Sequence, residues 1–222
     1  MQGLYVVTDQ LLCPGRTHVQ IARAAIEGGA RIVQLRDKDV SDREFFEAAV
    51  ELREITRATG ATFFVNDRVH IAAAVGADGV NIGQTDMPVA AARKVLGSDA
   101  IIGVSADSVD QAVQADRDGA DYVGFGPVFA TLTKLDAGPV SSLETLAEVV
   151  RRSAIPVVAI GGIGLGNIGL VAGSGAACAA VVSAVVCADD MASATRALIG
   201  EWILNTDGHG CPRMNTDVFA DG

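Results

Sequence analysis

Residues 155–188 read IPVVAIGGIGLGNIGLVAGSGAACAAVVSAVVCA, a stretch without a single charged side chain. Its length would suit a membrane span, but seven glycines, Pro156 and Asn167 interrupt the apolar residues. A span needs about 20 consecutive apolar residues, whereas short apolar runs bounded by glycine are typical of buried strands. The stretch therefore predicts a buried strand, a loop, a short helix and a second buried strand.

The same short apolar runs recur along the chain. Segments with helical patterning separate them, such as residues 40–60, where apolar side chains share one face and Ser41 can cap the first turn. The eight runs are at residues 3–8, 31–36, 62–66, 79–82, 101–105, 122–126, 157–160 and 179–183. Eight strands that each precede a helix predict an α/β fold, a (β/α)₈ TIM barrel rather than an open doubly wound sheet.

Length and composition indicate a single domain. The chain has 222 residues, of which 50% are hydrophobic, enough to build one large core. We expect residues 1–204 to form the barrel. After Trp202 the sequence loses its periodicity and becomes rich in Gly, Asp and Asn, which predicts a mobile tail over residues 205–222.

The charge of the chain limits its partners. A net charge of -10 argues against nucleic acid, because the phosphate backbone would be repelled, but small phosphorylated ligands fit if basic groups cluster locally. The cysteines show neither C-x-x-C spacing nor paired histidines, so no disulfide framework or zinc site is predicted. Because MQGLYVVTDQ lacks a signal-peptide pattern, we expect a cytoplasmic protein that spans no membrane. Formation of a homo-oligomer is left open.

Polar residues at the carboxyl ends of the predicted strands are the first candidates for a site, because barrel enzymes bind and react there. In VQLRDKD, Gln34, Arg36 and Lys38 occupy alternate positions. An extended backbone would point all three toward the barrel mouth. An ordinary charged turn at the end of a strand would account for this motif equally well.

Carboxylates follow the third and fourth runs. FFVNDR places Asn66 and Asp67 after one strand, and VNIGQTD places Asp86 after the next. Two carboxylates at neighbouring strand ends suit Mg²⁺, which completes its shell with water and substrate phosphates. Taken singly, each has a simpler use, Asp67 as a helix cap and Asp86 as the start of a turn before Pro88.

Groups that suit a phosphate follow the later runs. Residues 124–134 read GFGPVFATLTK, in which Thr131, Thr133 and Lys134 offer two hydroxyls and a cation. Ser105 ends the fifth run and can either bind a phosphate or cap the next helix. Barrels often hold a phosphate on backbone N–H groups after the seventh and eighth strands. The candidates at these places are Gly162, Val182 and Ser183.

Seven motifs, taken in order, resemble the thiamine-phosphate synthase family over approximately residues 3–188. They are YVVTD, VQLRDKD, FFVNDRVHIAAAVGADGVNIGQTD, IGVSADS, GADYVGFGPVFATLTK, IPVVAIGGI and VVSAV. Enzymes of that family join the methylene carbon of a hydroxymethylpyrimidine diphosphate to the nitrogen of a thiazole phosphate. The products are thiamine monophosphate and pyrophosphate, and Mg²⁺ assists. The resemblance therefore implies a transferase of thiamine biosynthesis.

Carried over by motif, the resemblance also implies roles for the candidate residues. The pyrimidine diphosphate would be bound by Gln34, Arg36, Lys38, Asn66, Ser105 and Lys134, and the thiazole phosphate by Thr131, Thr133, Gly162, Val182 and Ser183. Asp67 and Asp86 would hold Mg²⁺. Arg36, Lys38 and Lys134 would be catalytic, stabilising charge on the departing pyrophosphate. The chain departs from the family at Asn81, where histidine is usual, and in the loop after Lys134.

Two other functions fit parts of this sequence. A thiazole tautomerase of the same family would keep the barrel and the thiazole-phosphate site without coupling a pyrimidine, but the retained VQLRDK, both aspartates and TLTK argue against it. A non-catalytic sensor of phosphorylated metabolites would use the same fold without turnover. His18 and His70 are expected on helices as surface or packing residues, so no Ser–His or Cys–His nucleophile is predicted.

Overall fold

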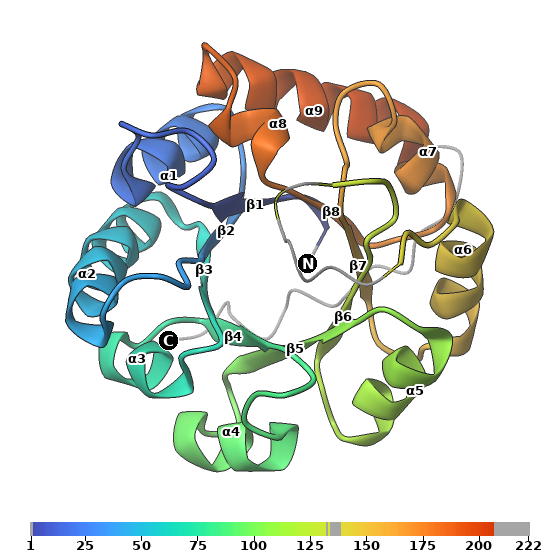
Figure 1. The fold of residues 1–222 in the computed structure, drawn as a ribbon, viewed down its shortest axis with the longest axis horizontal. Helices are drawn as coiled ribbons and strands as arrows, with labels where there is room; N and C mark the ends of the chain where they lie inside the picture. Colours follow the sequence, from blue (N-terminus) through green and yellow to red (C-terminus); the bar gives the residue numbers. More distant parts are fainter. Residues whose placement is uncertain (1, 132, 134–138, 207–222) are drawn as a thin grey trace.

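The computed structural model describes residues 2–131, 133 and 139–206. Eight parallel strands pair in sequence order and close into a barrel, because β8 pairs with β1 as well as with β7. Figure 1 shows the barrel from one end, with the helices arranged around it. The predicted (β/α)₈ TIM barrel is confirmed.

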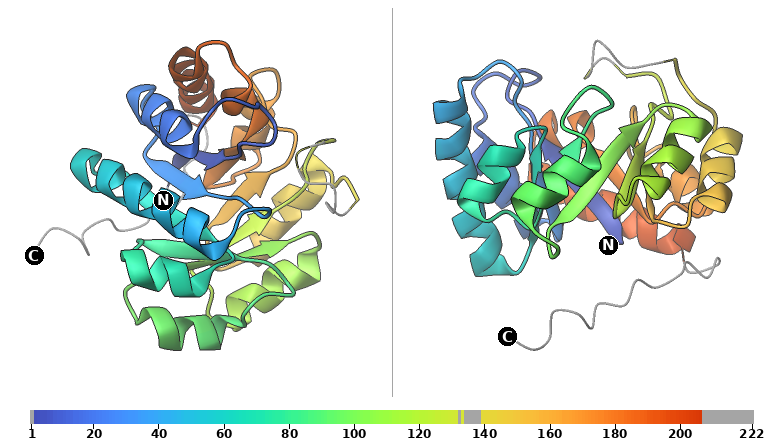
Figure 2. Two further views of the ribbon diagram at one scale, coloured as in Figure 1. Left: turned by 60° about the vertical axis from the view of Figure 1, so that its left-hand side comes forward. Right: turned by 90° about the horizontal axis from the view of Figure 1, so that it is seen from below.

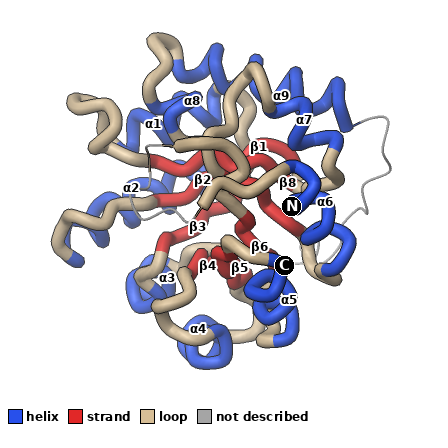
Figure 3. Tube along the Cα trace, turned by 45° about the vertical axis from the view of Figure 1, so that its right-hand side comes forward, coloured by secondary structure: helices blue, strands red, loops and turns tan. Residues whose placement is uncertain are grey.

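The strands lie close to the predicted apolar runs. Their bounds are β1 Gly3–Thr8, β2 Ile32–Leu35, β3 Thr62–Asn66, β4 Gly79–Ile82, β5 Ile101–Ala106, β6 Tyr122–Phe125, β7 Val157–Ile160 and β8 Cys178–Val181. The helices are α1 His18–Glu27, α2 Asp42–Thr59, α3 Val69–Val75, α4 Val89–Leu96, α5 Val109–Arg117, α6 Leu143–Arg152, α7 Ile168–Gly173, α8 Ser183–Val186 and α9 Met191–Thr206. Figure 3 shows the strands enclosed by the helices.

The charge-free stretch at residues 155–188 contains the predicted strand, short helix and second strand, followed by a helical turn that was not predicted. It forms β7, α7, β8 and the single turn α8, and β7 and β8 are adjacent in the barrel. Within residues 2–131 and 139–206, none of the helices combines the length and the hydropathy that crossing a membrane requires.

Helix α2 shows how the outer layer is held on the barrel. Ser41 accepts a hydrogen bond from the Glu44 backbone, and the Glu44 side chain caps the Ser41 backbone in return, which starts the helix. Its apolar stripe is buried against the strands, with Phe45, Ala49 and Leu52 each at most 1% exposed. The main hydrophobic core therefore lies between the barrel and its helices.

Helix α9 closes the barrel layer and continues past the boundary predicted at residue 204. Asn205 donates to the carbonyl oxygen of Glu201 at 2.8 Å, and Thr206 to that of Trp202 at 3.2 Å. Residues 207–222, the rest of the predicted tail, lie outside the described residues.

A second, smaller core fills the barrel itself. Phe64 packs against Tyr5 and Tyr122 with ring centroids 5.4 and 5.6 Å away. Gly103 makes room for this cluster, because a Cβ at that position would lie 2.0 Å from the Tyr122 ring. Figure 2 shows the barrel from the side, with the amino-terminal end of β1 opposite the loops that follow the strands.

Candidate active site

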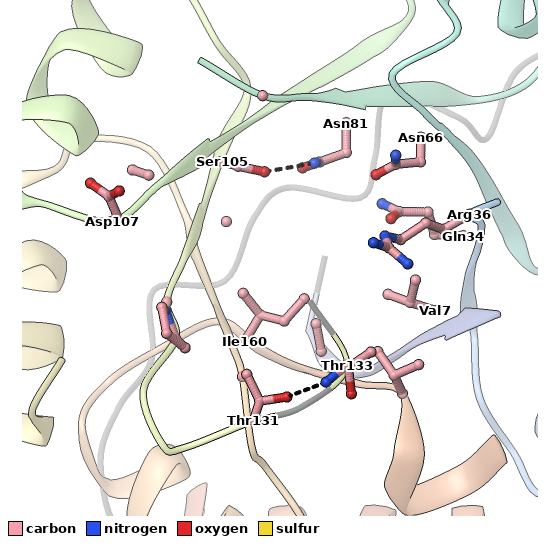
Figure 4. A pocket seen from close by; sticks show the side chains of 18 of the residues that line it. Val7, Gln34, Arg36, Asn66, Asn81, Ser105, Asp107, Thr131, Thr133 and Ile160 are labelled. Atoms are coloured by element: carbon pink, nitrogen blue, oxygen red, sulfur yellow. Dashed lines mark hydrogen bonds between the residues drawn. The ribbon is translucent and has the colours of Figure 1, made fainter. Parts of the chain in front are cut away.

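A cavity of about 340 Å³ opens at the carboxyl ends of the strands, and Figure 4 shows the residues around it. Each strand contributes to the lining, through Val7, Gln34, Asn66, Asn81, Ser105, Gly124, Ile160 and Ala180. The loops that follow the strands supply the rest. This is the end of a (β/α)₈ barrel where active sites are found.

The cavity gathers the residues predicted from the sequence. Those that line it are Gln34, Arg36, Lys38, Asn66, Asp67, Asp86, Ser105, Thr131, Thr133, Gly162, Val182 and Ser183. Lys134 lies outside the described residues. Thr131 and Thr133 lie on one side of the cavity and Asn66 and Asn81 on the other, as Figure 4 shows. The roles assigned to these residues stay predictions.

An ion pair orients Arg36. Its guanidinium donates to Asp9 Oδ2 at 2.8 Å, and the second Asp9 oxygen accepts hydrogen bonds from the backbone N–H groups of Leu11 and Leu12. Asp9 is 4% exposed, so its charge is compensated by these contacts. Sequence reasoning missed Asp9, although it directly follows β1 in YVVTD and could have been found by its position.

Buried contacts also fix the loop between Arg36 and Lys38. Asp37 points away from the cavity and accepts a hydrogen bond from His18 Nε2 at 3.1 Å, while Thr8 Oγ1 lies 2.8 Å from His18 Nδ1. Burial lowers the pKa of His18, which favours the neutral imidazole. Arg36 and Lys38, on either side of Asp37, both line the cavity, and His18 is a buried packing residue, as predicted.

Asp67 and Asp86 lie together at the ends of β3 and β4. Burial, and then the charge of Asp86, raise the pKa of Asp67 to about 6, while Lys38 and Arg36 act in the opposite direction. Asp67 has φ of 60°, a strained backbone conformation of the kind that clusters at functional sites. The two carboxylates thus concentrate negative charge at one point of the wall.

Of the two simpler roles considered for these carboxylates, one is wrong and the other is observed. Helix α3 has Arg68 at its N-cap and no side-chain capping hydrogen bond, so helix capping by Asp67 is wrong. Asp86 does stabilise its turn, since Oδ2 accepts from Gly83 N at 2.7 Å. Two carboxylates, rather than a larger cluster, suit Mg²⁺, which retains water and phosphate ligands. Within the described residues, no group of three or more His, Cys, Asp or Glu side chains could hold a metal.

Close packing of two loops places Thr131. Val128 N donates to Ile160 O at 2.9 Å, so the chain after β6 runs along the end of β7. Gly162 has φ of +63°, and a Cβ there would lie 2.4 Å from Ala130 O. Only glycine fits this approach. This contact fixes the loop before Thr131, which lines the cavity together with Gly162 and Ser183.

Ser105 faces the cavity and does not cap a helix. Its Oγ accepts a hydrogen bond from Asn81 Nδ2 at 2.9 Å, whereas Ser108 caps α5. Sequence reasoning missed Asn81 as part of the lining, and also Gln84 and Asp107. Gln84 and Asp107 follow β4 and β5, so their position after a strand was the available signal.

Comparisons with known proteins agree on one family. A family model described as thiamine monophosphate synthase matches residues 4–185. The chain is 49% identical over 194 residues to the thiamine-phosphate synthase of Methanospirillum hungatei, covering 87% of this chain and 94% of the relative. It is 52% identical over 195 residues to that of Chloroflexus aurantiacus, covering 88% and 90%. The solved thiamine phosphate pyrophosphorylase from Pyrococcus furiosus superposes with a TM-score of 0.84 at 42% identity, covering 92% of this chain and 96% of that one.

Proposed function

Because the chain belongs to the thiamine monophosphate synthase family, we propose that its cavity couples an aminopyrimidine methyl diphosphate to a thiazole phosphate, giving thiamine monophosphate and pyrophosphate. The chain is thus an enzyme, a transferase of thiamine biosynthesis. The observation that carries this assignment is the composition of one cavity, in which two cationic side chains, two carboxylates and two threonines meet. They are Arg36, Lys38, Asp67, Asp86, Thr131 and Thr133.

The pyrimidine diphosphate fits the side of the cavity formed by β2, β3 and β5. Gln34 and Asn66 are 5% and 8% exposed, so little solvent reaches their amides. Amides and the hydroxyl of Ser105 suit a heterocycle that carries both donors and acceptors. Arg36 and Lys38, with Lys134, are the groups that we assign to the diphosphate.

Asp67 and Asp86 are the residues that would hold Mg²⁺. The raised pKa of Asp67, caused by burial and by the charge of Asp86, indicates excess negative charge that a divalent cation would neutralise. When bound, Mg²⁺ supplies electrostatic stabilisation of the charge that develops on pyrophosphate oxygens. Arg36 and Lys38 act on the same charge from the neighbouring wall.

The bond changes need no nucleophilic side chain. The bond between the methylene carbon and the diphosphate oxygen breaks, and its electron pair leaves with pyrophosphate. The amino group of the pyrimidine donates electron density to the resulting cationic methylene. The thiazole nitrogen then shares its lone pair with that carbon to form the new C–N bond. Arg36, Lys38 and Lys134 lower the barrier by preorganised charge rather than by proton transfer.

The thiazole phosphate fits the other side of the cavity. Thr131, Thr133, Ser183 and the backbone N–H groups of Gly162 and Val182 are hydrogen-bonding groups that suit a phosphate. Thr133 N already donates to Thr131 Oγ1 at 3.2 Å, which turns the loop back on itself. Separate phosphate sites on two sides of one cavity would hold the thiazole nitrogen close to the methylene carbon of the pyrimidine diphosphate.

Pyrophosphate release tests this function directly. The purified chain should release pyrophosphate and form thiamine monophosphate only when both substrates and Mg²⁺ are present. A phosphate-metabolite sensor would bind the substrates in calorimetry without releasing pyrophosphate, and a thiazole tautomerase would isomerise the thiazole without consuming pyrimidine. Either result would replace the synthase assignment.

A cytoplasmic location is part of the same proposal. Among the described residues, Cys13, Cys178 and Cys187 form no disulfide, which is compatible with a reducing compartment. The partners that we propose are the two small phosphorylated substrates.

A further inference from the structure

A chain of hydrogen bonds crosses the barrel directly beneath the cavity. Gln34 Nε2 donates to Tyr5 OH at 2.7 Å, and Tyr5 OH lies 3.2 Å from Tyr122 OH. Tyr122 OH donates to Asn81 Oδ1 at 3.1 Å, and Asn81 Nδ2 donates to Ser105 Oγ at 2.9 Å. This series of hydrogen bonds begins and ends on residues that line the cavity, and the two tyrosines in its middle are buried.

Each hydrogen bond in this series points from donor to acceptor in the same direction, from Gln34 toward Ser105. Tyr122 uses its only proton toward Asn81, so its oxygen accepts the proton of Tyr5. Tyr5 in turn accepts from Gln34. Reversing the direction would require both hydroxyls and both amides to turn together, because a hydroxyl has one proton and each amide has distinct donor and acceptor ends.

This direction determines what the two ends present to the cavity. The Gln34 amide is held by its nitrogen, which leaves Oε1 as an acceptor and a second N–H as a donor. Ser105 Oγ accepts from Asn81, which leaves its own proton to donate. Among the described residues, neither Gln34 Oε1 nor the Ser105 hydroxyl proton has another hydrogen-bond partner.

The two tyrosines are rigidly placed. Each is 1% exposed, and Phe64 packs against both rings. Burial is the largest cause that raises the pKa of both phenols above the ordinary value, so both hydroxyls keep their protons at any pH where the enzyme works. A core of the same shape could be made from phenylalanine, so packing alone does not account for the hydroxyls.

We propose that Tyr5 and Tyr122 are positioning residues that fix the orientation of Gln34 and Ser105, and so select an amino-substituted pyrimidine over its oxo analogue. This inference rests on the proposed function. An aminopyrimidine presents an N–H donor beside a ring-nitrogen acceptor, which matches the acceptor and donor of the fixed Gln34 amide. The oxo analogue presents the reverse pattern, an oxygen acceptor beside a ring N–H. The oxo analogue would match the Gln34 amide only if that amide rotated so that its oxygen and nitrogen exchanged places.

Isosteric removal of each hydroxyl tests the inference. In Tyr122→Phe and Tyr5→Phe, the KM for the aminopyrimidine diphosphate should rise by about tenfold, the scale of one buried hydrogen bond, while the KM for thiazole phosphate stays unchanged. Competition by the oxo-pyrimidine diphosphate should strengthen, so that amino-over-oxo selectivity falls by about tenfold or more. Both effects should be constant from pH 6 to 9, because neither phenol ionises there.

Phe64→Leu is the matched control, because it disturbs the packing of both tyrosines without removing a hydrogen-bonding group. It should lower the melting temperature and keep the amino-over-oxo selectivity. The inference is overturned if folded Tyr122→Phe and Tyr5→Phe keep the wild-type KM and selectivity, or if Phe64→Leu loses selectivity to the same extent.

Calorimetric titration separates this inference from the proposed function. The affinities of the amino and oxo diphosphates for wild type and variants can be compared without turnover. A wild type that releases no pyrophosphate but discriminates the two ligands through Tyr5 and Tyr122 would contradict the function and support the inference. If wild type releases pyrophosphate normally and the variants keep the wild-type selectivity, the proposed function is supported and the inference about Tyr5 and Tyr122 is contradicted.

Discussion

Asp9 and Arg36 form an ion pair at the edge of the cavity, with Asp9 Oδ2 2.8 Å from Arg36 Nη1 and side chains that are 6% and 17% exposed. The same carboxylate accepts hydrogen bonds from Leu11 N and Leu12 N at 2.9 and 3.2 Å. One buried carboxylate therefore fixes both the loop after β1 and the direction of a guanidinium that lines the cavity.

Replacing Asp9 by asparagine should lower kcat/KM for pyrophosphate release by about 10- to 100-fold, because Arg36 loses the charge that orients it. Glu47→Gln is the control, since Glu47 pairs with Arg43 at 3.1 Å but both side chains are largely exposed, and such pairs contribute little. Wild-type kinetics in Asp9→Asn would show that Arg36 does not depend on this partner.

Asp67 should destabilise the metal-free protein at neutral pH. Burial and the neighbouring Asp86 raise its pKa from 3.8 to about 6, so the folded protein binds this proton more tightly than the unfolded chain does. The contribution of protonated Asp67 to the free energy of unfolding is fully present below about pH 4 and is lost as the pH rises through 6. The change in pKa alone would correspond to about 3 kcal/mol, but Asp67 is only half-buried and solvent screens its charge, so in EDTA at pH 8 we expect a loss of about 1–2 kcal/mol.

Asp67→Asn should abolish this loss of stability at high pH, and it should also abolish the activity. In EDTA at pH 8 the variant should melt at a higher temperature than wild type, and the difference should narrow as the pH falls to 5. Asparagine also tolerates the left-handed backbone at this position. Added Mg²⁺ should stabilise wild type more than the variant. Equal melting temperatures in EDTA at pH 8 would contradict the assigned pKa and its cause.

The strands were predictable because each one is an apolar run between turn residues. β1, β3, β4 and β7 match the predicted bounds. The eighth run, predicted at residues 179–183, shows the limit of the method. Its apolar valines continue past the point where the backbone turns, and Ser183 is the first residue of α8. Hydrophobic pattern predicts burial, but it does not show where an extended chain becomes helical.

The hydrogen bonds across the barrel were not predictable in the same way. Tyr5 and Tyr122 are 117 positions apart in the sequence, and an aromatic residue in a strand normally indicates only a core position. Their contact depends on the register of β1 and β6, which are not neighbours in the closed barrel. The residues at strand ends could be predicted because position along one strand is enough to place them at the mouth.

Lys134 should act as a fixed charge on pyrophosphate, since it directly follows Thr133, which lines the cavity. Lys134→Met should lower kcat by about 10²-fold or more, the scale for losing one preorganised donor, with thiazole phosphate bound nearly as before. Lys134→Arg should recover part of the rate because the charge survives. If Lys134→Met instead abolished thiazole-phosphate binding and left pyrimidine diphosphate affinity intact, the lysine would belong to the other substrate.

Gly162→Ala should damage the thiazole-phosphate side selectively. The new Cβ would lie 2.4 Å from Ala130 O on a backbone with φ of +63°, so the loop that carries Thr131 must move, at a cost of about 1–3 kcal/mol of stability. The KM for thiazole phosphate should rise more than that for the pyrimidine diphosphate. Gly166→Ala is the matched control, because a Cβ there meets nothing within 4 Å. If the two alanine variants showed the same melting temperature and the same KM values, the contact between Gly162 and Ala130 would not be what places Thr131 at the cavity.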